Sequence, residues 1–246
     1  MSFNEHNSVE HYIIQKLSGV NLNAVEASSS VVKEDATPYG SFRWQYRAAE
    51  ELNRPTDQVL LEGELREALI RINPEISANP AFADEVIYKL RAIFVAAHQT
   101  GLVRANEEFH AWLTGEKTMP FGENNRHVPV RLTDFENLDN NRFVITNQYA
   151  VKALETKIPD IVLLINGIPI VVGEAKTPIR PSVSWLDGAH EVHDIYENSI
   201  PQLFVPNLLS FATEGKELYY GSVRCPLEFW SPWRLESEEE GLVQQL

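Results

Sequence analysis

The chain has 246 residues, of which 43% are hydrophobic, enough for one large folded core or two small ones. Its formal net charge is −14 at pH 7, whereas a protein that binds nucleic acid unaided usually has a basic surface. No segment approaches the roughly 18 to 20 continuous apolar residues of a membrane span, and the first ten residues lack the features of a signal peptide. The single cysteine, Cys225, excludes an internal disulfide. We expect a cytoplasmic protein that either has no nucleic-acid substrate or acts on one held by another domain or subunit.

Helical patterns dominate the first half of the chain. Apolar residues recur at helical spacing around 9–17 and over 42–52, 60–72, 84–98 and 104–113, and Asn-Pro pairs at 73–74 and 79–80 separate two of these segments. The stripe of Val86, Leu90 and Ile93 is typical of a helix face that packs into the core. A helical layer over about 1–125 is the prediction.

The pattern changes beyond His127 to short segments typical of β-strands. They cover 128–135, 142–149, 161–165, 168–175, 208–213 and 217–223, with a helix predicted at 183–198. Hairpins combined with a crossover helix predict an α/β fold whose mixed sheet, at about 126–225, is flanked by helices. We expect a single domain at 1–236, followed by a linker at 237–246.

Two apolar strands flank Asn166-Gly167 in the segment 158–178, and charged residues stand at the far end of this hairpin. With a two-residue turn, Asp160 would lie opposite Gly173, and Glu174 would face the other way. With a three-residue loop at 166–168 and a bulge, Asp160 would lie opposite Glu174, with Cβ atoms about 4.5 to 5.5 Å apart. We favour the second register, partly because Pro169 has no N–H for a regular ladder.

In that register Lys176 shares a face with Glu174, because side chains alternate along a strand. Two carboxylates can hold Mg²⁺, with Mn²⁺ as a substitute, and the ion would stabilise charge at a phosphorus centre. Lys176 could orient a water, deprotonate it, or stabilise that centre. In the alternative structural interpretation, Asp160 ends a strand and Glu174 and Lys176 form a surface pair. The position of these charges at the ends of two apolar strands strengthens the functional interpretation, and both interpretations stay open.

Segments from 131 to 223, including RLTDFENLDNNRFVITNQYAV, IPDIVLLINGIPIVVGEAKTP and YENSIPQLFVPNLLSFATEGKELYYGSV, resemble the N-terminal endonuclease domain of the R subunit of type I restriction enzymes, in the PD-(D/E)XK superfamily. The resemblance implies a restriction-endonuclease-like fold and Mg²⁺-dependent cleavage of double-stranded DNA. It also implies that Asp160 and Glu174 bind metal, that Lys176 is catalytic, and that Glu10 on the first helix helps to bind the metal.

The chain departs from the family pattern at two points. Many members have Gln-x-x-x-Tyr on the helix after the catalytic strand; Tyr196 matches, but Val192 stands where the glutamine would be. The chain also has no G-x-x-x-x-G-K-[ST] loop, so ATP would be used by a motor domain elsewhere in a longer protein, reached through 237–246. The resemblance further implies modification and specificity subunits as partners.

Other residues near this segment have competing interpretations. Lys157 and Arg180, and also Lys152, could contact DNA phosphates or be ordinary solvated charges. His190 and His193 are three residues apart, which does not match the H-E-x-x-H zinc pattern, and Asp134 is better explained by a turn. Two alternative functions stay open: a noncatalytic assembly or regulatory module that docks onto the motor, and a nuclease for RNA or repair intermediates.

Overall fold

The computed structural model describes residues 9–22, 44–153, 155–177 and 183–233. Within these ranges a seven-stranded sheet has the order β1-β4-β7-β8-β9-β10-β11. The pairs β1/β4 and β8/β9 are parallel and the others are antiparallel, so the predicted mixed sheet is confirmed. Its strands are β1 (Gln45–Tyr46), β4 (Phe143–Asn147), β7 (Ile161–Ile165), β8 (Ile168–Ala175), β9 (Leu209–Thr213), β10 (Leu218–Gly221) and β11 (Ser231–Pro232).

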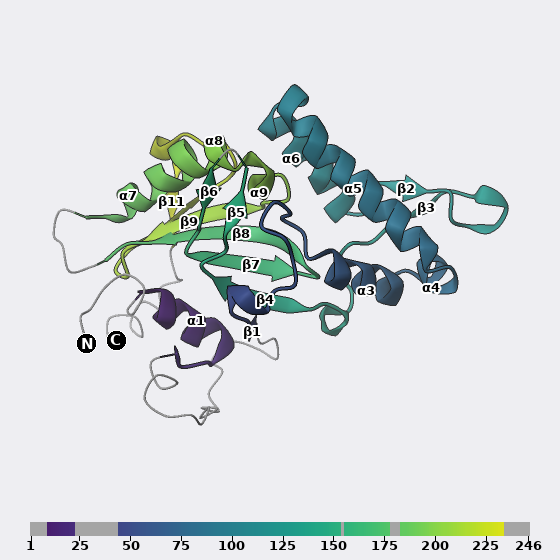
Figure 1. The fold of residues 1–246 in the computed structure, drawn as a ribbon, viewed down its shortest axis with the longest axis horizontal. Coiled ribbons are helices and arrows are strands. Elements are labelled where there is room, and N and C mark those ends of the chain that lie inside the picture. The colour runs from purple at the N-terminus through teal and green to yellow at the C-terminus, as the bar shows by residue number, and fades with distance from the viewer. Residues whose placement is uncertain (1–8, 23–43, 154, 178–182, 234–246) are drawn as a thin grey trace.

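Helices cover both faces of the sheet (Figure 1). On one face lie α7 (Trp185–His190), the π-helix η5 (Glu191–Tyr196), α8 (Glu197–Ser199) and α9 (Pro201–Phe204). The helix α1 (His11–Ser18) covers the other face, where Ile14 packs with Ile145, Ile161 and Phe211. The larger core includes the α7 side of the sheet. The predicted helices at 9–17 and 183–198 are therefore confirmed, the second with a π-helical middle.

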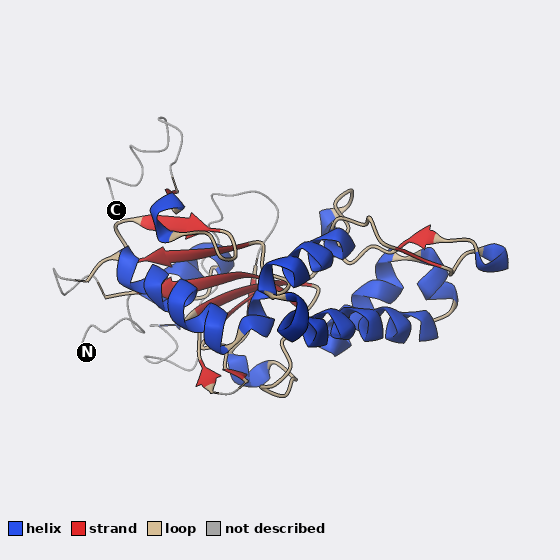
Figure 2. Ribbon diagram, turned by 90° about the horizontal axis from the view of Figure 1, so that it is seen from above, coloured by secondary structure: helices blue, strands red, loops and turns tan. Residues whose placement is uncertain are grey.

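A helical group extends from one end of the sheet (Figure 2). It contains α3 (Glu62–Ile72), α4 (Pro74–Ala78), α5 (Ala81–Thr100) and α6 (Leu102–Leu113), which agree with the helices predicted at 60–72, 84–98 and 104–113, apart from α4. Val86, Leu90 and Ile93 are buried, as the pattern predicted. No helix of the described residues is long and apolar enough to cross a membrane.

Two predicted elements are wrong. The described part of 42–52 is not an α-helix but β1 and the 3-10 helix η2 (Ala49–Glu51), because pairing with β4 and the contact of Trp44 with Phe143, at 5.3 Å between ring centroids, override local helical pattern. Of 128–135, only β3 (Val128–Pro129) is a strand, and it pairs with β2 (Thr118–Met119) outside the main sheet. The predicted helical layer therefore contains strands. A further hairpin, β5 (Val151–Lys152) with β6 (Thr156–Lys157), was not predicted.

A glycine couples the central strands to α1. Gly173 on β8 pairs with Phe211 on β9, and a Cβ atom at Gly173 would lie only 2.1 Å from the Phe211 ring. The missing side chain gives that ring its place over β8, where it packs with Ile14 of α1. Gly173 thus leaves the space occupied by the ring against which α1 packs.

We expect Gly173→Ala to lower the free energy of unfolding by about 1 to 3 kcal/mol, because the added methyl group overpacks the core. Gly63→Ala is the matched control, because Gly63 lies on the exposed face of α3 with open space around it. Alanine at that position should raise the free energy of unfolding by about 0.5 to 1 kcal/mol. Urea unfolding of both variants measures the difference. Equal stability of the two variants would show that the Phe211 ring adjusts without cost.

Candidate active site

The turn between β7 and β8 is held in the protein interior. Asn166 and Gly167 have φ angles of 51° and 77°, the conformation of a two-residue hairpin turn. The Asn166 side chain is fully buried: its Nδ2 donates to the Leu132 carbonyl at 3.0 Å, and its Oδ1 accepts from the Arg142 N–H at 2.9 Å. A Cβ atom on Gly167 would meet the Leu61 carbonyl at 2.6 Å. The position of the turn is therefore fixed by packing as well as by local preference.

The three-residue loop preferred above is wrong, because Ile165 pairs with Ile168 across a two-residue turn. The register nevertheless shifts by one residue within the hairpin: Leu164 pairs with Pro169, whereas Leu163 pairs with Val171. The bulge at Ile170 brings Ile161 opposite Gly173. Asp160 and Glu174, the next positions along each strand, therefore lie opposite each other, as the favoured register predicted.

Asp160, Glu174 and Lys176 meet at the end of the sheet where β7 begins and β8 ends. Figure 1 shows these two neighbouring strands in the middle of the sheet. The Asp160 Oδ2 atom accepts the backbone N–H of Ala175 at 2.9 Å, which ties the two strand ends together. Lys176 continues the ladder through its N–H to the Thr213 carbonyl at 2.8 Å. Its ammonium group donates to Glu174 Oε1, also at 2.9 Å. The predicted trio is one cluster.

Glu10, at the start of α1, approaches this cluster through the segment after β4. Gln148 has a φ of 53° and sits just beyond the strand, with its Nε2 atom 3.2 Å from Glu10 Oε2 and 3.2 Å from Asp160 Oδ1. Asn147 Nδ2 donates to the same Glu10 carboxylate at 3.3 Å. The buried Glu10 carboxylate is thus linked to Asp160 through the Gln148 amide. No sequence pattern pointed to Gln148.

The π-helix η5 contributes Glu191, which the sequence analysis did not single out. Glu191 Oε2 accepts a hydrogen bond from Lys176 Nζ, and Glu191 Oε1 accepts the Tyr196 hydroxyl at 3.1 Å. Tyr196 thus lies next to the cluster through Glu191, and its proximity to DNA stays a prediction. Val192 is fully buried and belongs to the main hydrophobic core. A search for a carboxylate one residue before the missing glutamine would have found Glu191.

Burial controls the electrostatics of the cluster. Burial and the neighbouring Asp160 raise the pKa of Glu174 to about 9, against the opposing effect of Lys176. Burial also raises the pKa of Asp160, although the Ala175 N–H and Lys176 act in the other direction. Partial burial would lower the pKa of Lys176, but Glu174 and Glu191 raise it above its usual value. Lys176 is therefore a cation at neutral pH.

Other predicted contacts lie elsewhere or have other partners. Lys157 pairs with Glu155 at 2.9 Å, and Arg180 lies outside the described residues, as do the predicted linker and the end of the predicted domain. His190 and His193 both contact Asp194 at 2.7 Å, and Asp134 accepts the N–H groups of Glu136 and Asn137 in a turn, as expected.

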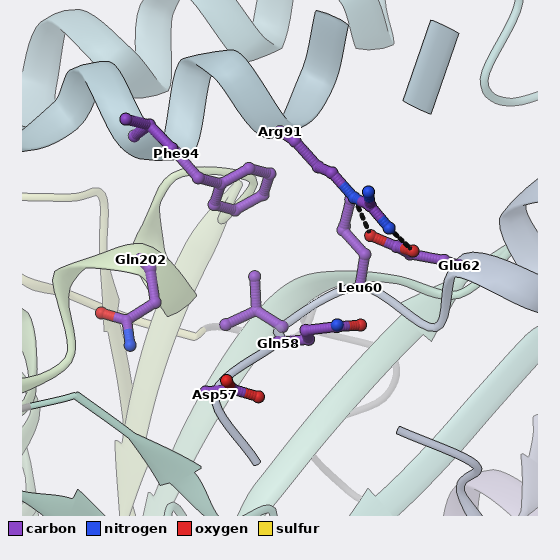
Figure 3. A pocket seen from close by; sticks show the side chains of 9 residues that line it. Asp57, Gln58, Leu60, Glu62, Arg91, Phe94 and Gln202 are labelled. Carbon is purple, nitrogen blue, oxygen red and sulfur yellow. Dashed lines mark hydrogen bonds and ion pairs between the residues drawn. The ribbon is translucent and has the colours of Figure 1, made fainter. Parts of the chain in front are cut away.

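A hollow of about 360 Å³ between α5 and α9, bordered by the Arg91–Glu62 ion pair, contains none of the cluster's residues (Figure 3).

The cluster suits a hard divalent cation. One oxygen of Glu174, Oε2, is buried and makes no hydrogen bond, which is costly for a carboxylate unless something else binds it. Among the described residues no group of three or more His, Cys, Asp or Glu side chains is arranged around a metal position. Mg²⁺ needs only one or two carboxylates, together with waters and substrate oxygens. Asp160 and Glu174 can supply these.

A mixed sheet flanked by helices, with a carboxylate pair and a lysine on its central hairpin, defines a restriction-endonuclease-like domain. The family model described as type I restriction enzyme R protein N terminus matches residues 35–229. The chain therefore belongs to the family of type I restriction enzyme R protein N-terminal domains.

Two relatives illustrate the range of similarity. The type I restriction enzyme HindI endonuclease subunit of Haemophilus influenzae is 28% identical over 81% of this chain and 19% of its own length. The "Putative type I restriction enzyme MjaIXP endonuclease subunit" of Methanocaldococcus jannaschii is 26% identical over 96% of this chain and 21% of its own length. The chain spans about a fifth of the length of these relatives.

The raised pKa of Glu174 predicts how the metal-free protein responds to pH. Below its ordinary pKa of 4.5, both the folded and the unfolded protein carry the proton; between there and about pH 9 only the folded protein keeps it. The stability contributed by Glu174 is thus present at low pH and is lost as pH rises towards 9. Relative to Glu174→Gln, which stays neutral, the wild type should lose roughly 1 to 3 kcal/mol between pH 5 and 8 in EDTA. Parallel stability curves for the two proteins would contradict the shift.

Proposed function

We propose that this chain is a Mg²⁺-dependent endonuclease domain that hydrolyses DNA phosphodiester bonds, with Mn²⁺ able to replace Mg²⁺. The observation that carries the proposal is the unpartnered, buried Oε2 atom of Glu174, on a carboxylate that stands opposite Asp160. Membership of the R-protein family and the likeness to endonuclease subunits support the same chemistry.

Each residue of the cluster has a role in this proposal. Asp160 and Glu174 would hold the ion, which when bound stabilises charge on the phosphorus centre and lowers the pKa of a water. Lys176 would orient the attacking water or stabilise the charged centre, because its ammonium group is held at the cluster by Glu174 and Glu191. Glu10 would support Asp160 through Gln148, since its carboxylate accepts the amides of Gln148 and Asn147.

The negative charge of the chain indicates that DNA is held by other parts of the enzyme. A net charge of −14 opposes binding to phosphates, and the relatives are about five times longer than the stretch matched here. We therefore assign DNA translocation to an ATP-driven motor domain in the same full-length chain, and recognition to modification and specificity subunits. Cleavage would then act on DNA that these partners position.

The test is cleavage of supercoiled plasmid by the full-length subunit assembled with its partners, with ATP and Mg²⁺. Glu174→Ala and Asp160→Ala should each lower the cleavage rate roughly 100-fold or more, because the ion loses a ligand. ATP hydrolysis should stay at the wild-type level. Asp194→Ala is the matched control, since Asp194 is an exposed carboxylate paired with two histidines and should be dispensable.

The outcome separates this function from its alternatives. Equal cleavage by wild type and Glu174→Ala in the assembled enzyme would mean that the cluster is structural, and a noncatalytic module docking onto the motor would then explain the domain. Faster cleavage of a matched RNA than of the plasmid would retain the metal site but overturn the assigned substrate.

A further inference from the structure

Two carboxylates from different parts of the fold share the Lys176 ammonium group. Glu174 comes from β8, and Glu191 comes from the π-helix above it; each accepts a hydrogen bond from Lys176 Nζ. The Lys176 side chain is 14% exposed and that of Glu191 is 33% exposed, so the contact is shielded from bulk water. A lysine side chain has a flexible four-carbon stem. Two fixed hydrogen-bond acceptors therefore restrict its ammonium group far more than a single acceptor would.

The π-helical register gives Glu191 its place. In η5 the residues five apart in sequence face the same side, so the Tyr196 hydroxyl reaches Glu191 Oε1 while Glu191 Oε2 stays with Lys176. Val192 takes the inward position in the core. The preceding helix packs closely on the sheet at Gly188, where a Cβ atom would lie 3.3 Å from Ala212 Cβ and 3.4 Å from Glu174 Cγ. A π-helical segment is less favourable than an α-helix, and such segments recur at functional sites.

We propose that Glu191 is a positioning residue: anchored by Tyr196, it holds the Lys176 ammonium group in the direction needed for cleavage. An ammonium group has three N–H donors, so bonds to Glu174 and Glu191 set the direction of the third. Glu191 acts through Lys176 and leaves ion binding to Asp160 and Glu174. The inference rests on the proposed nuclease function and adds a role for a residue outside the predicted trio.

The experiment compares Glu191→Ala, Glu191→Gln and Lys176→Ala in the assembled full-length enzyme, with Asp194→Ala as the control on the same helix. Single-turnover cleavage rates are measured across a Mg²⁺ titration. Glu191→Ala should lower the maximal rate about 10- to 100-fold and change the half-saturating Mg²⁺ concentration less than about threefold. Glu191→Gln should stay within about threefold of wild type, because its amide oxygen still accepts from Lys176 and its amide nitrogen can donate to Tyr196.

The results distinguish this inference from the underlying function. If Lys176→Ala is inactive while Glu191→Ala cleaves like wild type, the nuclease proposal stands and the role of Glu191 is wrong. Equal damage by Glu191→Ala and Glu191→Gln, or a shift in Mg²⁺ dependence as large as the loss of rate, would also overturn it. Full activity of Lys176→Ala would instead contradict the nuclease mechanism itself.

Discussion

The pairing register of β7 with β8 is the constraint on which the candidate site depends. A shift by one residue would turn Glu174 to the opposite face of the sheet and separate it from Asp160. The turn at Asn166-Gly167 is anchored by buried hydrogen bonds, and the bulge at Ile170 then moves the register by one position. Because β8 also pairs with β9, the same register aligns Gly173 with Phe211 and so connects the sheet to α1.

The fold also bears the cost of placing carboxylates beside an apolar core. Burying a charge is unfavourable unless it gains hydrogen bonds or an opposite charge. Asp160 gains the Ala175 N–H and the Gln148 amide, and Glu174 gains the Lys176 ammonium at only one of its two oxygens. The remaining oxygen and the raised pKa values of Asp160 and Glu174 describe a site with less positive charge than its carboxylates need, and a divalent cation would supply more.

The sequence was sufficient to predict the hairpin of 161–165 with 168–175 and the grouping of Asp160, Glu174 and Lys176, because apolar strands, a turn signal and charge placement act locally. The turn was predicted wrongly. A three-residue loop and a two-residue turn followed by an internal bulge give the same final register, so the position of the charges does not distinguish them. β1 was missed because its pairing with β4, a hundred residues away, decides its structure. Glu191 and Gln148 were missed because a π-helix and a positive φ angle, which no simple periodicity predicts, bring them to the site.

The central claim is that Asp160 and Glu174 together form a divalent-cation site. The most direct measurement is anomalous diffraction from crystals grown with Mn²⁺, for the wild type and for Glu174→Gln. The account predicts an anomalous peak in contact with carboxylate oxygens of both Asp160 and Glu174 in the wild type, and its loss in the variant. A wild-type map with ordered side chains at both residues and no peak between them, at a Mn²⁺ concentration that supports cleavage, would contradict the account.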